Sequence, residues 1–426
     1  MGFHKIIMNY FDNKINLGVL FDQNPESGGG YQQQINQILL LKKICNLKVY
    51  VTDKKNIRNL DKYSLDIIHL KPSLTNRIVN IIKKIALSKK DYSISSFAPS
   101  IFHNFIHKFL LNLESSNNIE KNIAKNDIEL FFFLSPSIFA NNFKRINYIF
   151  TIWDITHIEQ FEFPEVANSI CFRREWINQA SKKAIAVITD SELAKQRISQ
   201  RYNLIDSRIH VMGFSPSIFT NISKTDYKKN FIDIKNKYRI KNSYIFYPAQ
   251  LWAHKNHSYI IKSISILERK YGYKLHVVFS GYNHGNLNFL KSVVREMGLS
   301  RRVHFIGFVE DNLMPYLYKQ SIALVMPTYF GSTNIPPLDA FALEVPVIYS
   351  DLPGLRSQVN NAALLIDLKS YDSLALALKK LIEQPALRKK LIDEGKKTLA
   401  LNNDRLRIQI FEGIIQDFRM KKFTYS

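Results

Sequence analysis

A polar turn that leads into the start of a helix is the segment of this sequence best suited to hold a phosphate group. Residues 326–351 read MPTYFGSTNIPPLDAFALEVPVIYSD, which predicts a strand, a turn, an apolar helix and a second strand. Asn334 can cap the helix, and the prolines at 336 and 337 suit its first turn. The free N–H groups and the positive end of the helix dipole would face the ligand crevice of an open α/β sheet. An ordinary strand–turn–helix connection would have the same pattern.

A run of three glycines offers a second place where a ligand could approach the backbone. Gly28, Gly29 and Gly30 lie between an apolar run at residues 17–21 and a helical pattern that begins near Tyr31. A loop without side chains lets a ligand come close to the main chain. A flexible loop explains a glycine run equally well, and the position directly after a strand favours the ligand.

Strands and helices alternate along both halves of the chain, and they must position these two segments. In the first half, strands are predicted at residues 17–21, 47–51, 67–70, 130–134, 148–152 and 184–188. After a polar, basic stretch at residues 221–242, interpreted as the connection between domains, strands are predicted at 244–247, 275–280, 303–305, 323–326 and 345–349. Residues 405–421 predict a late amphipathic helix. Two Rossmann-like domains in series are the simplest account of this α/β pattern.

Length and composition agree with this organisation. A chain of 426 residues with 46% hydrophobic residues is too long for one ordinary core and suits two globular domains. Cys45 and Cys171 form neither a disulfide framework nor a paired metal-ligand spacing, which indicates a reducing cytoplasm. The start of the chain lacks the pattern of a signal peptide, and no run of about 20 apolar residues predicts a membrane span. We therefore expect a protein that is neither secreted nor threaded through a bilayer.

The net charge of +23 calls for a partner or a surface with negative charge. Nucleic acid is not expected, because no recognition motif is present and the lysines are scattered. An anionic membrane leaflet fits better, since residues 77–113 combine lysines with bulky apolar residues at near-helical spacing. The alternative is that this apolar stripe is core and its lysines form a solvated face.

The segment at residues 326–351 resembles the donor-binding signature of the retaining family 4 glycosyltransferases of the GT-B fold, in which a proline and a short polar turn precede PPLDA and VPVI. The resemblance is specific from residue 244 to 367, weaker from 16 to 219 and nearly absent between 54 and 126. It implies two Rossmann-like domains that face each other across a cleft. These would be an acceptor domain at residues 1–220, a nucleotide-sugar donor domain at 221–402, and a helix at 403–426 that returns to the first domain.

The resemblance also implies roles for the residues of the turn. Asp339 matches the family acid that accepts hydrogen bonds from the ribose hydroxyls, a role that suits a carboxylate near a helix start. Backbone N–H groups would be presented to the diphosphate by Ser332, Thr333, Asn334 and Ile335. Gly331 occupies the position at which the family has a glutamate that contacts the donor sugar. Either the donor sugar is held differently here, or Thr333 and Asn334 have taken over that contact. Phe308 and Val309, in VHFIGFV, resemble the strand and turn beside the nucleotide base.

Lys255, in YPAQLWAHKNH, matches the family lysine that reaches the diphosphate. Such a cation stabilises the leaving group, because negative charge gathers on the phosphate oxygen as the bond to the anomeric carbon breaks. The family arginine five positions earlier is Gln250 here, so one fixed positive charge is lost. His254 and His257 are the nearest substitutes, although a histidine at a helix start needs no catalytic role. The alternative for Lys255 is an ordinary lysine on the protein surface, without a role in the reaction.

The segment TIWDITHIEQFEFPE resembles a strand end where the family usually has His-Asp, with the histidine directed at the donor sugar. Trp153 occupies the histidine position, and Asp154 follows. Asp154 is the best candidate for an acid beside the reacting centre, as an acceptor base or as a structural hydrogen-bond acceptor. His157 could stand in for the missing histidine, or could be buried or capping.

These features predict a glycosyltransferase of the hexosyltransferase type, which transfers a hexose or deoxyhexose from a nucleoside-diphosphate sugar to a glycan or lipid-linked oligosaccharide. Its expected setting is the biosynthesis of a surface polysaccharide, O-antigen or capsule, at the inner face of a membrane. The resemblance implies retention of configuration and a metal-independent enzyme without a cofactor. Two other readings stay open: a nucleotide-sugar epimerase or hydrolase, and a non-catalytic nucleotide- or glycan-binding protein, for which Gln250 and Gly331 are the best evidence.

Overall fold

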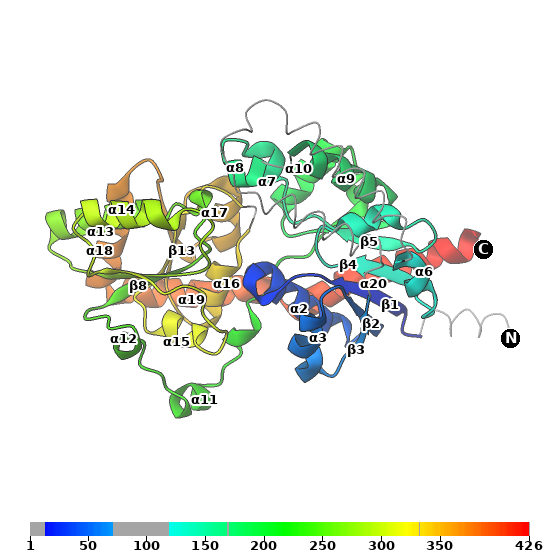
Figure 1. Ribbon diagram of the computed structural model, residues 1–426, viewed down its shortest axis with the longest axis horizontal. Coiled ribbons are helices and arrows are strands. Elements are labelled where there is room, and N and C mark those ends of the chain that lie inside the picture. Colours follow the sequence, from blue (N-terminus) through cyan, green and yellow to red (C-terminus); the bar gives the residue numbers. More distant parts are fainter. Residues whose placement is uncertain (1–12, 71–118, 168–169, 332, 426) are drawn as a thin grey trace, which may run out of the picture.

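The computed structural model describes residues 13–70, 119–167, 170–331 and 333–425 of the chain. The basic, apolar stretch at residues 77–113 and the turn residue Ser332 therefore lie outside the described residues. Figure 1 shows two α/β lobes side by side, with helices on the faces of each sheet. This arrangement confirms the predicted α/β class with two Rossmann-like domains.

The first lobe contains a parallel sheet of seven strands in the order β3-β2-β1-β4-β5-β6-β7. The strands are β1 Asn16–Phe21, β2 Asn46–Val51, β3 Asp66–His69, β4 Leu130–Phe133, β5 Tyr148–Thr151, β6 Ala186–Thr189 and β7 Ile209–Val211. The helices are α2 Gly29–Leu41, α3 Lys54–Leu60, α6 Ile119–Ala124, α7 Thr156–Glu159, α8 Pro164–Ala167, α9 Ile170–Lys183 and α10 Glu192–Tyr202. The hydroxyl of Ser191 accepts from the N–H of Ala194 and caps α10.

The second lobe contains a parallel sheet of six strands in the order β10-β9-β8-β11-β12-β13. The strands are β8 Tyr244–Pro248, β9 His276–Ser280, β10 Val303–Phe305, β11 Leu324–Met326, β12 Val347–Ser350 and β13 Ala363–Ile366. The helices are α11 Lys224–Lys229, α12 Ile234–Lys237, α13 His257–Tyr271, α14 Leu287–Glu296, α15 Met314–Lys319, α16 Ile335–Ala342, α17 Pro353–Val359, α18 Tyr371–Glu383 and α19 Pro385–Leu401.

Buried strands hold each lobe together, because a parallel sheet is covered by helices on both faces. In β4, Leu130 and Phe132 belong to one core cluster, whereas Phe131 and Phe133 belong to the cluster on the opposite face. Successive side chains of a strand point to opposite faces, which explains why an uninterrupted apolar run forms a strand here. All four residues are at most 1% exposed.

The last helix, α20 (Asp404–Tyr425), leaves the second lobe and crosses back to the first, as Figure 1 shows. Its side chains Phe411, Ile414, Ile415 and Phe418 are buried in the same core cluster as β1 and α2. The core clusters support a division of the chain near residues 220 and 402, which we propose as the domain boundaries.

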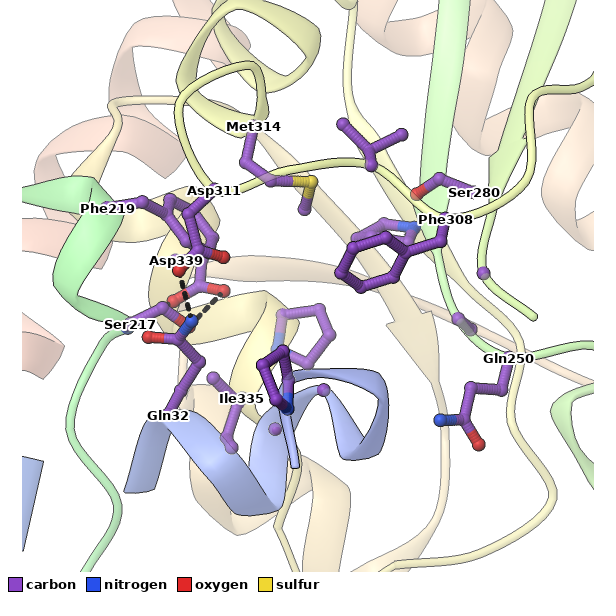
Figure 2. Close-up of a pocket in the computed structure, with 18 of the residues that line it drawn as sticks. Gln32, Ser217, Phe219, Gln250, Ser280, Phe308, Asp311, Met314, Ile335 and Asp339 are labelled. Carbon is purple, nitrogen blue, oxygen red and sulfur yellow. Dashed lines mark hydrogen bonds between the residues drawn. The ribbon is translucent and has the colours of Figure 1, made fainter. Parts of the chain in front are cut away.

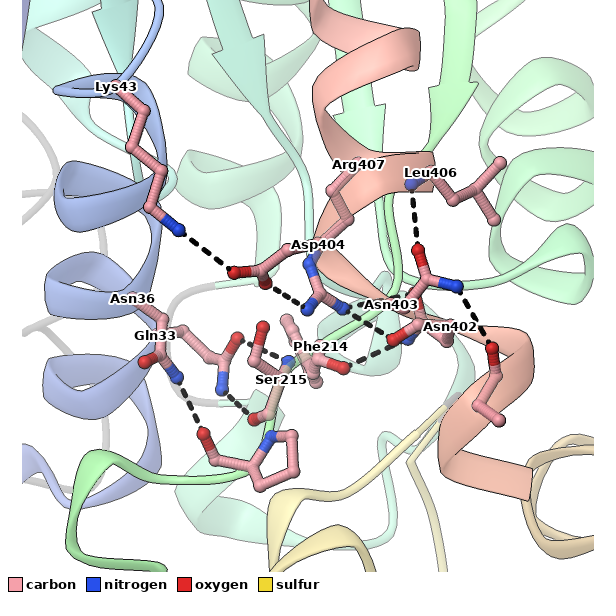
Figure 3. Close-up of polar contacts among 12 residues, drawn as sticks. Gln33, Asn36, Lys43, Phe214, Ser215, Asn402, Asn403, Asp404, Leu406 and Arg407 are labelled. Atoms are coloured by element: carbon pink, nitrogen blue, oxygen red, sulfur yellow. Dashed lines mark hydrogen bonds and ion pairs between the residues drawn. The ribbon is translucent and has the colours of Figure 1, made fainter. Parts of the chain in front are cut away.

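Polar contacts hold together the two chain segments that connect the lobes (Figure 3). The side-chain amide of Asn402 donates to the carbonyl of Phe214, 2.9 Å away, and Arg407 donates to the carbonyl of Asn402 at 2.9 Å. Arg407 also forms an ion pair with Asp404 at 2.7 Å, and Lys43 of the first lobe reaches the same carboxylate at 3.3 Å. These contacts fix the start of α20 against the first lobe.

Candidate functional site

The carboxyl ends of the central strands of both sheets meet at the boundary between the lobes. The loop after β1 leads into α2, the loop after β8 carries Lys255, and the loop after β11 leads into α16. In each sheet the strand order reverses beside β1 or β8, and ligands of doubly wound folds bind at such switch points. Figure 1 shows α2 and α16 close together at the boundary.

Two adjoining cavities lie at this boundary and share walls formed by the glycine loop and by the loop after β8. The first includes Asp339, Ser217, Phe308, Val309 and Gln250, and we call it the ribose cavity. The second includes Lys255, Asp154, Trp153, Thr333 and Asn334, and we call it the lysine cavity. Gly28, Gly29, Gln250 and Ile335 line both.

The glycine loop brings the first lobe into close contact with the second. Gly28 has φ 61° and ψ −113°, a conformation that side chains disfavour, and it precedes α2. A Cβ atom on Gly29 would lie 2.7 Å from Cδ1 of Ile335, the first residue of α16. A Cβ atom on Gly30 would lie 3.2 Å from the Trp153 ring. The start of α2 can approach the cleft this closely because its first residues have no side chains.

Asp339 lies at one end of the ribose cavity, where it accepts two hydrogen bonds from Ser217 of the interlobe connection. The Ser217 N–H donates to Oδ1 at 2.6 Å, and its hydroxyl donates to Oδ2 at 3.0 Å. Burial raises the pKa of Asp339 to about 8, which the Ser217 hydrogen bonds oppose and nearby Asp311 reinforces. Gln32 of α2 donates to Asp311 at 2.8 Å, and Figure 2 shows these four side chains together.

The opposite end of the ribose cavity is aromatic, as Figure 2 shows for Phe308 beside Ser280. The Phe308 ring stacks on Tyr282 with centroids 5.0 Å apart and an angle of 22°. Phe308 remains 42% exposed, although Val309 next to it is buried. A planar base could stack at this end while a ribose lies toward Asp339.

Lys255 is half-buried in the lysine cavity, with its ammonium group 3.4 Å from Oδ1 of Asn334. Its carbonyl accepts from the Tyr247 hydroxyl at 3.0 Å, which fixes the backbone after β8. Burial lowers the pKa of Lys255 to about 8, and the nearby carboxylate of Asp154 opposes this shift. Among the described residues that line the two cavities, Lys255 is the only lysine or arginine.

Asn334 occupies the position before α16, but its side chain does not cap the helix, contrary to the prediction. Its amide instead donates to the Tyr349 hydroxyl at 2.6 Å, and its N–H donates to Oε1 of Gln358 at 2.9 Å. The backbone N–H predicted for phosphate binding is therefore already used at this residue. Thr333 donates its hydroxyl to Asp190 of the first lobe at 2.5 Å, and Ile335 packs on Gly29.

Gln250 links the two lobes and supplies no charge in place of the family arginine. Its amide donates to the carbonyl of Glu26, in the loop before the three glycines, at 2.8 Å. Its Oε1 accepts from the Trp252 indole at 2.8 Å. Trp252 in turn stacks on His284 with centroids 3.9 Å apart. Gln250 therefore holds the glycine loop against the second lobe.

Neither His254 nor His257 replaces the missing cation. Nδ1 of His254 lies 2.9 Å from Glu165 of the first lobe, and burial lowers the pKa of the imidazole to about 4. His257 is fully buried between Tyr247 and Phe279, and burial lowers its pKa to about 3. Both imidazoles are neutral near pH 7, so Lys255 carries the positive charge of the two cavities.

Asp154 lines the lysine cavity, whereas His157 does not. Oδ1 of Asp154 accepts from the N–H and from the hydroxyl of Thr156, at 2.9 and 2.5 Å, so it fixes the start of α7. His157 is fully buried, with Nε2 3.5 Å from the Tyr202 hydroxyl, because the short helix α7 turns this side chain into the lobe. The geometry leaves Asp154 as a candidate and gives His157 no access to the cleft.

Buried neutral histidines predict a loss of stability in mild acid. Burial lowers the pKa of His157 to about 4 and that of His257 to about 3, from an ordinary value of 6.5. Below pH 6.5 the unfolded chain therefore binds more protons than the folded chain, and the free energy of unfolding falls as pH falls. We expect a loss on the order of several kcal/mol between pH 7 and pH 4.5 in urea titrations.

His157→Phe removes one of the imidazole groups that bind a proton only in the unfolded chain, so the free energy of unfolding should depend less on pH. Equal unfolding free energies at pH 7 and pH 5 in the unmodified protein would contradict this prediction.

Sequence reasoning missed several residues of the site because they come from parts of the chain without a motif. Ser217 lies in the connection between the lobes, and Glu165 lies on the short helix α8. Asp190 lies between the end of β6 and the start of α10. Only the fold brings these side chains to the cleft.

Two facing Rossmann-like domains with a lysine and the starts of two helices at their boundary define a GT-B architecture. Residues 229–398 match the family described as Glycosyl transferases group 1. The described residues contain no helix of the length and apolarity that crossing a membrane requires. No three histidine, cysteine or acidic side chains gather as metal ligands in the described part of the chain.

Solved structures share this fold over nearly the whole chain. A glycosyltransferase from Rickettsia africae superposes with a TM-score of 0.66 and 16% identity, covering 95% of this chain and 99% of the other. Anabaena HepE, solved in complex with UDP and glucose, superposes with a TM-score of 0.67 and 15% identity over 95% and 99% of the two chains. These similarities establish the GT-B fold.

Among curated proteins, the O-antigen chain mannosyltransferase RfbU of Salmonella typhimurium is 27% identical over 239 residues, which are 56% of this chain and 62% of the relative. The O-antigen chain mannosyltransferase B of Escherichia coli is 21% identical over 225 residues, 51% and 57% of the two chains. The chain thus spans about half the length of the curated relatives that it matches.

Proposed function

We propose that this protein is a glycosyltransferase that moves a hexose or deoxyhexose from a nucleoside-diphosphate sugar to a glycan or lipid-linked oligosaccharide, with retention of configuration. The observation that carries the proposal is the position of Lys255. It lies beside the start of α16 and the glycine loop, in a cavity that adjoins the ribose cavity with Asp339. The match to group 1 glycosyl transferases and the similarity to O-antigen mannosyltransferases support it.

In this proposal each cavity holds a different part of the donor. The base stacks near Phe308 and Val309, and the ribose hydroxyls lie toward Asp339. The diphosphate lies where the two cavities join, between Lys255, the start of α2 and the N–H groups of Thr333 and Ile335. The sugar occupies the lysine cavity, with Asp154 near the acceptor.

The reaction breaks the bond between the anomeric carbon and the phosphate oxygen, and the electron pair stays on the leaving diphosphate. Lys255 stabilises this charge through space and by hydrogen bonding. The acceptor hydroxyl attacks the anomeric carbon from the same face, and its proton passes to the leaving phosphate oxygen or to Asp154. Front-face attack is the economical route to retention.

A nucleotide-binding panel tests the proposal directly. Thermal unfolding is measured with UDP, GDP, dTDP and ADP, each with and without EDTA, on the unmodified protein and on Lys255→Ala. We expect one nucleotide to raise the unfolding temperature independently of EDTA, and we expect the rise to shrink in the variant. Lys291→Ala, on the exposed face of α14, is the matched control and should keep the full shift. The absence of a shift with every nucleotide would contradict the proposal.

The replacements at Gln250 and Gly331 favour a second candidate, a non-catalytic protein that binds a nucleotide or a glycan. Such a protein would bind the nucleotide in the panel but would turn over no donor. An epimerase or hydrolase would release free sugar, free nucleotide or an isomerised donor without any acceptor. Incubation of the donor with and without a glycan acceptor, followed by mass spectrometry, separates the three functions.

We further propose that the protein works at the inner, cytoplasmic face of a membrane, in the biosynthesis of a surface polysaccharide such as O-antigen or capsule. The net charge of +23 supports attraction to anionic lipids and to lipid diphosphates. We expect sedimentation with vesicles that contain about 30% anionic phosphatidylglycerol, and release as salt is raised, because salt screens these charges. Binding that is equal for neutral and anionic vesicles would contradict the electrostatic mechanism.

A further inference from the structure

Part of the wall of the lysine cavity is made of aromatic rings, and we call this part the aromatic wall. The side chains that form it have flat rings: Trp153, Phe214, Trp252, His254 and Phe330. Trp153 meets Phe214 edge to face with centroids 6.4 Å apart, and Phe330 stacks on His254 with centroids 4.3 Å apart. The two pairs come from different lobes, so the aromatic wall surrounds the cavity from both sides.

Gly331 lies beside this wall and leaves no room for an acidic side chain. Its φ of 133° is unfavourable for any residue with a Cβ atom. A Cβ atom there would lie 2.7 Å from Nδ2 of Asn334, which is itself held by the Tyr349 hydroxyl. A carboxylate at this position would therefore require the turn and the Asn334 network to move.

Most polar side chains of the cavity already have partners within the protein. Asp190 accepts from Thr333 and from Ser191. The amide of Gln33 is bonded to Ser215 through both its nitrogen and its oxygen, at 2.6 and 3.0 Å. Sugar hydroxyls that enter the cavity thus meet few polar groups that can replace their bonds to water, and unreplaced bonds weaken binding.

We propose that the sugar-binding part of the lysine cavity selects a 6-deoxyhexose over the corresponding hexose. This inference rests on the proposed function, since it concerns the sugar of the donor. A 6-deoxyhexose presents a methyl group where a hexose presents a hydroxymethyl group. The methyl group packs on the aromatic wall without losing a hydrogen bond, whereas the hydroxyl of the hexose loses its bonds to water there.

The test compares pairs of donors that share a nucleotide and differ only at carbon 6. With the nucleotide identified by the panel, calorimetric titrations compare the 6-deoxy and the parent sugar in the gluco, manno and galacto series. We expect the 6-deoxy donor to bind about tenfold more tightly in at least one series. Equal or tighter binding of the hexose in all three series would overturn the inference. Binding of the free nucleoside diphosphate, measured in the same titrations, tests the proposed function separately.

Two substitutions of one residue show whether the aromatic wall causes the selectivity. Trp153→Phe keeps an apolar face beside Gly30, and the ratio of the two affinities should remain at least threefold in favour of the 6-deoxy donor. Trp153→His introduces a polar ring, and the ratio should fall to about one, because the hydroxyl regains a partner. Thermal unfolding of each variant checks that it is folded. A ratio that is the same in both variants would overturn the assignment of selectivity to this wall.

Discussion

Lys255→Ala should lower the rate of sugar transfer by about 10²–10³-fold, which is the usual effect of removing one group that stabilises charge in a transition state. The effect is expected to be large because no other lysine or arginine among the described residues lines the ribose cavity or the lysine cavity. The arginine that would share this role in the family is Gln250, which is engaged with Glu26 and Trp252. Steady-state rates with the preferred donor, beside the Lys291→Ala control, measure the loss.

Lys255→Arg distinguishes the charge of this residue from its shape. The pKa of Lys255 is lowered to about 8, so the free protein loses this charge as pH rises through 8. Affinity for the nucleoside diphosphate should therefore decline above pH 8 in the unmodified protein. Arginine stays charged throughout this range, so the decline should be smaller in Lys255→Arg, and the part that remains reports on Asp339, whose pKa is also raised to about 8. A decline of the same size in both proteins would show that another group is titrating.

Gly29→Val should nearly abolish transfer while leaving each lobe folded. A Cβ atom on Gly29 would lie 2.7 Å from Cδ1 of Ile335, and the two methyl groups of valine would displace the Ile335 side chain and disturb the contact between the glycine loop and the start of α16. We expect a loss of about 100-fold or more in turnover, because a displacement of about 1 Å at a catalytic centre can cost that much.

A second substitution makes the collision itself testable. Ile335→Ala removes the side chain that meets Gly29 and should restore much of the turnover of Gly29→Val. The two changes are therefore expected to be strongly non-additive in a double-mutant cycle. Additive losses would indicate that valine acts by disturbing the start of α2 instead of the contact between the lobes.

Much of the fold could be predicted because buried parallel strands are nearly continuous apolar runs. β10 was predicted with the bounds Val303–Phe305 that the structure has, and the other predicted strands differ by a few residues at their ends. β7 and β13 were not predicted; both lie at sheet edges, but so do β3 and β10, which were predicted, so edge position alone does not explain the difference. The connection at residues 221–242 contains α11 and α12, and its Ile234 and Ile240 belong to the second core.

The site was less predictable than the fold because its hydrogen bonds join distant parts of the chain. Sequence could place Lys255 and Asp339 after strands, but it could not indicate that Ser217 binds Asp339. The capping role predicted for Asn334 was wrong because Tyr349 and Gln358 compete for its polar groups. The proposed roles of Asp154 and the glycine loop stay predictions until variants are measured.

The return of α20 to the first lobe has a consequence for the order in which the chain folds. The first lobe lacks Phe411, Ile414, Ile415 and Phe418 until the whole second lobe has been synthesised. A nascent chain that ends before α20 therefore exposes an apolar surface on the first sheet, which favours aggregation or capture by a chaperone. The core cluster of the second lobe contains no residue of α20, so this lobe can complete its core first. The second lobe is thus expected to complete its fold before the first, although it is synthesised later.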